Sequence, residues 1–460
     1  MRMKHPAAVT QFGYFPLVMS YIEQASNQIS FVEIQQNLIR KNYELQAKNY
    51  DFSFDDGEIP QPPSRQGKGR QTDMYNQLSQ ILNELIHFGL VEVKNQRNNN
   101  SLFGGMIPAQ NPGSNIAEHW VCHLTSKGHE LLQLANGPKI LEFKARYFNL
   151  MFNYFPIVSK FLHAVHNGGK DSVVLPHVTA QQLGLEELDL ENPRDLSSYL
   201  DEVTESVLST YKDQVKTPKE WVDRDFRLRR PKLEEKILKT SQQYRESGKK
   251  YPRFLIIARI RDYCVSYFAH VLTGDKTISG RSLEALSSRL AKMEIMGYSD
   301  YIYKGRLLFL CSWVVPLLNA SADRQVSNDY KKFSLESLKS ETQAYCLVMH
   351  QPEYPHIKNK FEESLVRTFD KLYFRQFKQF VSIPDLRENV CLDLKISAKS
   401  FDKLMKNAYN DSFYGESSLE ITLAYDPGYV EYGLEQWHRV PLRLEGRPIT
   451  VAKIKKRVTP

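Results

Sequence analysis

Apolar and polar residues recur at helical spacing in several segments of the chain, and these segments lead into short strand-like runs. Near the N-terminus, Phe15, Val18 and Ile22 mark one helix between residues 12 and 24. A second helix is expected after Ser30, because Glu33 follows three residues later and the two have the spacing of a capping box. The pattern therefore begins with two neighbouring helices.

A third helix follows residues 52–69, which are rich in proline, glycine and charge and are typical of an exposed loop. Thr72 or Asp73 can cap this helix, and Gly89 suits its C-terminal end. Its apolar stripe consists of Leu78, Ile81, Leu82, Leu85 and Ile86. The elements expected next are a strand at 91–93, a long loop at 95–115, a strand at 120–124 and a closing helix from Thr125.

The C-terminal part has the same order of elements. Helices are expected at residues 361–380 and from Ser382 onward, with Pro384 in a first turn, where proline is tolerated. The following elements are a turn at 396–397, a helix at 398–409, strands at 419–426 and 447–455, and a loop at 426–446 between the strands. No internal repeat at a fixed period is visible.

This order of elements resembles the winged helix-turn-helix superfamily. The resemblance rests on the helix at 74–88, on the strand sequence GLVEV after it, and on the sequence HLTSKGHELL after the loop. It covers residues 12–136 and 361–457. It implies that the second helix of each turn motif enters the major groove of DNA, while the loop, or wing, contacts the backbone or the minor groove.

The region between the two ends is expected to be helical, with an apolar helix at 254–272 and another at 281–296. A hairpin is expected at 301–313, with Lys304 and Gly305 at its turn. A helix followed by a hairpin fits a third, degenerate winged helix, or a helical middle domain that carries one small ribbon. Both interpretations stay open at this point.

We therefore predict a mainly α fold with small β-wings and several domains. The expected domains are an N-terminal winged helix at 10–136, a helical region with an acidic stretch at 139–215, a basic connector at 216–252, a helical middle with a hairpin at 253–330, and a C-terminal winged helix with a basic tail at 331–460.

Charge is distributed unevenly along the 460 residues, although the net charge is only +8. Residues 171–213 hold ten acids against two bases, whereas residues 216–253 hold thirteen bases against six acids. Basic segments favour contact with phosphates. The alternative is that the neighbouring acidic and basic segments pack on each other.

Basic residues near the expected turn motifs and wings are candidates for phosphate contact, and Gln71, Asn76 and Gln80 could read base edges. Lys68 and Arg70 are expected just ahead of a helix, where backbone N–H groups also attract phosphate. The DNA-binding candidates are Arg65, Lys68, Arg70, Gln71, Lys94, Arg97, Lys395, Lys399, Lys403, Lys406, Arg439, Arg447, Lys453, Lys455 and Lys456. For the N-terminal and the C-terminal candidates alike, the alternative to DNA contact is an ordinary polar face in contact with water.

Enzyme signatures are few. The chain has no GxxxxGK[ST], HExxH, GxSxG or CxxC motif, and its five cysteines are widely spaced. His163 and His166 form an HxxH pair, but no thiols lie nearby in the sequence. We therefore expect both to be ordinary histidines rather than metal ligands. The string Pro384–Asp385, then Asp393 and Lys395, is similar to the PD…(D/E)xK pattern of Mg²⁺-dependent nucleases. The residues between fit a helix, on which the two carboxylates could not share one metal.

The predicted function is non-enzymatic binding of double-stranded DNA without a cofactor. The expected setting is a prokaryotic mobile-element, replication or phage-defence system, with a protein partner that could be an ATPase. The alternatives are a kleisin-like interaction subunit of a chromosome-organising ATPase complex, a Mg²⁺-dependent nuclease and a sequence-specific regulator. No signal peptide or membrane span is evident, so a cytoplasmic, nucleoid-associated location is expected.

Overall fold

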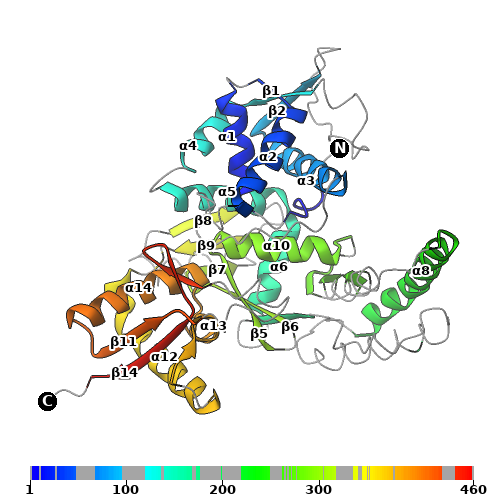
Figure 1. Ribbon diagram of the computed structural model, residues 1–460. Coiled ribbons are helices and arrows are strands. Elements are labelled where there is room, and N and C mark those ends of the chain that lie inside the picture. Colours follow the sequence, from blue (N-terminus) through cyan, green and yellow to red (C-terminus); the bar gives the residue numbers. More distant parts are fainter. Residues whose placement is uncertain are drawn as a thin grey trace.

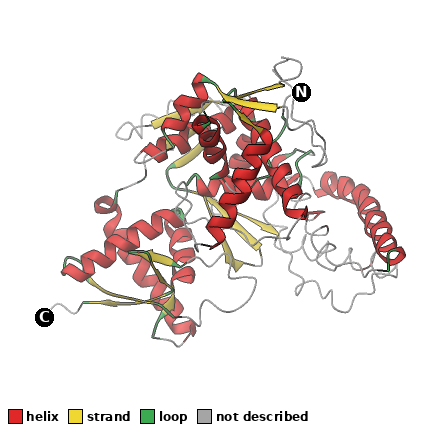
Figure 2. Ribbon diagram, turned by 45° about the horizontal axis from the view of Figure 1, so that its top comes forward, coloured by secondary structure: helices red, strands yellow, loops and turns green. Residues whose placement is uncertain are grey.

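The computed structural model describes the chain from residue 3 to residue 457 with gaps. The described residues are 3–9, 12–25, 28–47, 68–95, 120–135, 139–167, 172–176, 198, 219–248, 259, 262–263, 266, 269–270, 272–275, 277–303, 305–317, 335–339, 344–349, 351, 353–376, 379–426 and 441–457. Over these residues the fold is mainly helical with small antiparallel sheets (Figures 1 and 2).

In the N-terminal unit, the described residues between 12 and 135 form four helices and one three-stranded antiparallel sheet. Its elements are α1 (Tyr14–Gln24), β1 (Ile29–Ser30), α2 (Phe31–Ala47), α3 (Lys68–His87), β2 (Val91–Asn95), β3 (Trp120–Leu124) and α4 (Ser126–Gln133). The strand order is β1-β3-β2, so the short strand before α2 pairs with the last strand of the unit.

Local signals in the N-terminal unit form as the sequence predicts. Ser30 Oγ accepts a hydrogen bond from the Glu33 backbone N–H at 3.2 Å, and the Glu33 carboxylate accepts from the Ser30 N–H at 2.9 Å, which confirms the capping box. Gly89 has φ +68° and ends α3. The start of α3 differs from the prediction, because the helix begins at Lys68 rather than at Thr72 or Asp73.

The middle unit contains a second three-stranded sheet. Helices α5 (Ile140–Tyr154) and α6 (Pro156–His166) lead to β4 (Ser172–Pro176), so residues 139–215 are not uniformly helical as predicted. The described residues between Arg259 and Thr273 are helical, and α10 (Gly280–Lys292) leads to the hairpin β5 (Met296–Tyr303) and β6 (Gly305–Leu310). The predicted hairpin forms, but it spans residues 296–310 rather than 301–313, and the helix before it ends at Lys292 rather than at 296. Strand β4 adds to the hairpin in the order β4-β6-β5.

Helix α8 (Lys219–Glu246) occupies most of the predicted basic connector, residues 216–252. A helix was not expected in this segment, and Pro231 lies inside it. Lysine, arginine, glutamate and leucine are good helix formers, and over 28 residues they outweigh one proline. In Figure 1 α8 lies at the edge of the protein, and Arg259 Nη1 donates to the Lys236 carbonyl at 3.0 Å and to Thr240 Oγ1 at 2.9 Å.

The C-terminal unit, residues 354–457, begins with the same order as the N-terminal unit: a helix, a short strand, two helices and a strand. Its elements are α12 (Tyr354–Gln376), β10 (Val381–Ser382), α13 (Ile383–Leu394), α14 (Ala398–Tyr414), β11 (Leu419–Ala424), β12 (Leu442–Leu444), β13 (Arg447–Ile449) and β14 (Val451–Lys456). The sheet order is β10-β14-β11, and β12 and β13 form a separate hairpin. The single strand predicted at 447–455 is thus divided between β13 and β14.

The three sheets share one topology. In each, helices separate the first strand from the other two strands, and the last strand of the sheet lies in its middle. The middle unit therefore contains a three-stranded sheet, which is more than the one small ribbon of a helical middle domain. A further sheet, of order β7-β9-β8, joins β7 (Val314–Leu317) to β8 (Leu335–Lys339) and β9 (Tyr345–Met349), on both sides of the predicted boundary at residue 330.

One contiguous cluster of buried apolar side chains extends through all three units. Helix α13 packs against β5, and α4 packs against α5, so the units are joined by secondary-structure contacts as well as by the chain. In Figures 1 and 2 the N-terminal and C-terminal units lie at opposite ends of the protein.

Candidate nucleic-acid interface

Helix α14 carries the exposed lysine face of the C-terminal unit. Ser397 caps the helix by accepting a hydrogen bond from the Ser400 N–H at 3.0 Å, and Gly415, with φ +79°, ends it. Its inner face is formed by Phe401, Leu404 and Met405, which are all buried. This inner face fixes the helix on α12 and α13, and the opposite face is exposed.

The lysines of α14 follow one another at helical spacing on its outer face. Lys403 and Lys406 are exposed, and Lys399 is half-buried. Both acidic residues of the helix are engaged: Asp402 accepts from Arg387 Nε at 2.8 Å, and Asp411 pairs with Lys358. The face therefore retains a positive charge.

Burial also affects the charge of Asp402. It raises the pKa of this carboxyl group, although Arg387 and Lys406 act in the opposite direction. The Asp402 carboxylate therefore binds a proton at a higher pH than an exposed aspartate does.

Other C-terminal candidates lie on the strands. Lys455 and Lys456 on β14 and Arg447 on β13 are exposed, but Glu420 lies directly across from Lys455 in the sheet. Lys453 is half-buried, with Nζ 5.9 Å from the centre of the Phe380 ring. These side chains widen the basic region unevenly.

Lys395 contributes to the joint with the middle unit. It ends α13 in the left-handed conformation, with φ +53°, and its carbonyl accepts a hydrogen bond from the Ser312 N–H at 2.8 Å. Its Nζ lies 5.2 Å from the centre of the Phe309 ring. The arrangement brings Lys395 to a contact between two units instead of to the outer face of α14.

The N-terminal candidates are described less completely. The first turn of α3 contains Lys68, Arg70 and Gln71. Lys68 and Arg70 were predicted to lie ahead of the helix, so this prediction is wrong. Lys94 is exposed on β2. The remaining candidates Arg65, Arg97 and Arg439 lie outside the described residues. The DNA contacts of all these residues stay predictions.

The later half of α3 is covered by the N-terminal segment of the same chain. Gln80, considered as a base-reading residue, accepts a hydrogen bond from the Ala8 N–H at 2.9 Å. Glu84, one turn later, accepts from the Ala7 N–H at 2.7 Å. This part of the helix is therefore used for contacts within the protein.

A buried ion pair connects α3 to α10, the equivalent helix of the middle unit. Arg289 donates to Glu84 through Nη1 at 2.9 Å and Nη2 at 2.5 Å, and both side chains are fully buried. The Tyr147 hydroxyl donates to the same carboxylate at 2.9 Å, and the Phe15 ring centre lies 4.3 Å from the guanidinium carbon. Sequence patterns gave no sign of this pair, because its members are 205 residues apart.

The nuclease-like string does not assemble a metal site. Asp385 lies in the first turn of α13 and Asp393 in its last turn, about 12 Å apart along the axis at 1.5 Å per residue. Asp393 accepts from Ser364 Oγ at 2.5 Å and pairs with Arg367. The helix expected between the two carboxylates is confirmed, and within the described part of the chain no group of three or more His, Cys, Asp or Glu could hold a metal ion.

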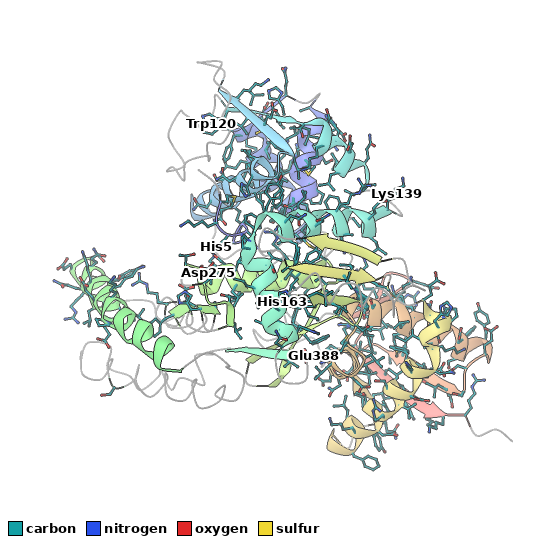
Figure 3. All side chains as sticks on the ribbon, turned by 180° about the vertical axis from the view of Figure 1, so that it is seen from behind. His5, Trp120, Lys139, His163, Asp275 and Glu388 are labelled. Atoms are coloured by element: carbon teal, nitrogen blue, oxygen red, sulfur yellow. The ribbon has the colours of Figure 1, made fainter. Side chains whose placement is uncertain are left out.

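A cavity of about 590 Å³ lies between the N-terminal segment, the end of α3, the α5–α6 corner and the loop before α10. His5 Nε2 lies 2.7 Å from Thr277 Oγ1, which donates to Asp275 at 2.7 Å; Figure 3 labels His5 and Asp275 side by side. Burial lowers the pKa of His5, with Asp275 acting against it and Lys4 and Lys160 adding to it. No pattern in the sequence indicates this cavity, because its lining residues come from distant parts of the chain.

Comparison with models of known protein families, with curated proteins and with solved structures returns no match to this chain. Among the helices of the described residues, none combines the length and the apolar character needed to cross a membrane.

Proposed function

We propose that this protein is a non-enzymatic double-stranded DNA-binding protein that contacts DNA through α14. We further propose that the N-terminal and C-terminal units are winged helices, and that the middle unit is a third. The order of helices and strands, with the last strand in the centre of each sheet, supports this assignment. In a winged helix, α14 is the helix that enters the major groove.

The observation that carries the proposal is the exposed lysine face of α14. Lys403 and Lys406 are exposed on a helix whose own acids are paired with Arg387 and Lys358. Lysines on such a face neutralise phosphates and release counterions, which makes binding depend on salt. The equivalent helices α3 and α10 instead contribute to the buried joint around Glu84 and Arg289.

The proposed biological setting is a prokaryotic mobile-element, replication or phage-defence system, with nucleoid association through DNA. No cofactor is needed for the proposed binding. The wings of the two end units would add backbone contacts through Arg97 and Arg439, and Lys94 and Arg447 lie on described strands beside them.

Charge reversal on α14 tests the proposal. The variant K403E/K406E is compared with K360E/K371E, a matched control on exposed positions of α12 in the same unit. We expect the first variant to bind a random-sequence duplex at least about tenfold more weakly and to lower the salt slope by about 2, since two phosphate contacts are lost. Fluorescence anisotropy measures both quantities. Equal losses in the two variants would contradict the assignment to α14.

A kleisin-like interaction subunit of a chromosome-organising ATPase complex is the second candidate. It is favoured by one observation: α3 and α10 make contacts within the protein through the buried Glu84–Arg289 pair. In this chain, the helices equivalent to α14 can therefore bind protein surfaces rather than DNA. Purification of the tagged full chain from its native host, followed by identification of a stoichiometric ATPase, would support this function, particularly if duplex binding is absent.

A further inference from the structure

The outer face of α14 continues beyond its lysines into two exposed aromatic side chains. Phe413 is 74% exposed and Tyr414 is 73% exposed. Phe413 follows Lys406 by seven residues, close to two helical turns, so the two lie on the same side of the helix. The ring centres of Phe413 and Tyr414 are 5.3 Å apart and their planes are nearly perpendicular, at 85°.

This aromatic pair is not needed for the core of the unit. The sequence pattern predicted a helix that ends at residue 409, and the last buried apolar side chain of α14 is Ala408. The helix nevertheless continues to Tyr414 and presents both rings to solvent. Two adjacent large aromatic side chains with most of their surface in water are characteristic of a binding surface rather than of a solvated helix end.

Electrostatics divide the face into two parts. The lysines occupy the first half of α14, whereas the aromatic pair lies at the C-terminal end, where the helix dipole disfavours a phosphate. Arg457 donates to the Ser412 carbonyl at this end and offsets part of that negative potential. The aromatic end of α14 therefore suits a neutral, flat group better than it suits a phosphate. An unpaired base is such a group, and it lies next to the phosphate backbone.

We propose that α14 recognises DNA at a boundary between duplex and single strand. Lys399, Lys403 and Lys406 contact duplex phosphates, while Phe413 and Tyr414 stack on unpaired bases. The distance along the helix from Lys406 to Phe413 is about 10 Å at 1.5 Å per residue, which corresponds to about three base steps of 3.4 Å. Stacking on aromatic side chains accepts any base, so the preference concerns DNA structure and not its sequence. This inference rests on the proposed DNA binding.

The test compares three fluorescent ligands in anisotropy titrations with the full chain: a blunt duplex, the same duplex with a ten-nucleotide overhang, and the single strand alone. The variants are F413A/Y414A and the matched control Y373A/F374A, which removes two aromatic residues from exposed positions of α12, where Phe374 is 71% exposed. All four side chains are exposed, although Tyr373, at 40%, also stacks on the buried Phe369, so any loss of stability from these changes should be larger in the control.

We expect the wild type to bind the overhang duplex at least about fivefold more tightly than the blunt duplex, because one stacked base contributes at least that factor. F413A/Y414A loses this preference and keeps its affinity for the blunt duplex, while Y373A/F374A keeps both. Equal wild-type affinity for the two duplexes, or a preference that survives F413A/Y414A, overturns the inference. The same holds if F413A/Y414A leaves all DNA affinities unchanged but loses a co-purifying protein. Absence of binding to every ligand instead refutes the proposed function itself.

Discussion

Replacing Arg289 by methionine tests whether the buried ion pair holds the N-terminal and middle units together. The Glu84 carboxylate would keep its hydrogen bonds from Tyr147 and from the Ala7 N–H, but would lose both bonds from Arg289. Removing one partner of a buried ion pair costs about 3–5 kcal/mol, because the remaining charge is left buried without compensation. Burial lowers the pKa of Arg289, but the neighbouring Glu84 carboxylate raises it by more, so the pKa lies above its usual value.

The measurement is the free energy of unfolding in urea, followed by circular dichroism and by tryptophan fluorescence. The matched control is R146M, since Arg146 pairs with Glu142 at 2.7 Å on the surface, with side chains 52% and 45% exposed. Such an i,i+4 pair contributes about 0.3–0.5 kcal/mol. We expect a loss of at least about 3 kcal/mol for R289M and below about 0.5 kcal/mol for R146M.

The double variant E84L/R289M separates charge burial from packing. Replacing a buried ion pair by apolar side chains of similar volume is often close to neutral, so the double variant should recover most of the stability that R289M loses. If R289M remains within about 1 kcal/mol of the wild type, the pair does not hold the two units and the reasoning is refuted.

Two further predictions concern the fold. Burial lowers the pKa of His163 to about 4, from 6.5 in an unfolded chain, so between these values the unfolded chain binds a proton that the folded chain does not. The free energy of unfolding should therefore fall by about 1–2 kcal/mol between pH 7.5 and pH 5. Urea unfolding of H163N should lack this part of the pH dependence. An unchanged pH dependence in H163N would contradict the lowered pKa of His163. In α4, a Cβ on Gly128 would lie 2.2 Å from the Leu90 carbonyl oxygen. G128A should thus lower Tm through a loss of about 1–3 kcal/mol, although alanine usually stabilises a helix relative to glycine, and a raised Tm would contradict the close contact.

Elements with local signals could be predicted from the sequence. The capping box of Ser30 and Glu33 and the left-handed Gly89 depend on neighbouring residues only, and both form as expected. The hairpin of β5 and β6 was also found, because its turn joins two adjacent apolar runs.

Features that depend on distant residues could not be predicted in this way. Strand β4 pairs with β6, which follows more than 120 residues later, and neither strand indicates its partner. Helix α8 was not expected, because proline and a high density of charge are typical of a connector, whereas its many helix-forming residues outweigh one proline in the structure.

The candidate site illustrates the same limit. Periodicity identifies the polar face of a helix, yet it does not indicate whether another part of the chain covers that face. Gln80 and Lys403 both lie on polar faces of predicted helices, but Gln80 is bonded to Ala8 while Lys403 is exposed. The exposure of Phe413 was missed for a related reason, since the apolar pattern ends before the helix does.

The measurement that tests the central claim most directly is the binding of the wild-type chain to a random-sequence duplex, followed by fluorescence anisotropy across a series of salt concentrations. If Lys399, Lys403 and Lys406 each neutralise one phosphate, the logarithm of the binding constant should fall with the logarithm of salt with a slope of about −3, and more steeply if strand residues such as Lys456 also contribute. Absence of binding at the lowest salt concentration would contradict DNA binding by this protein.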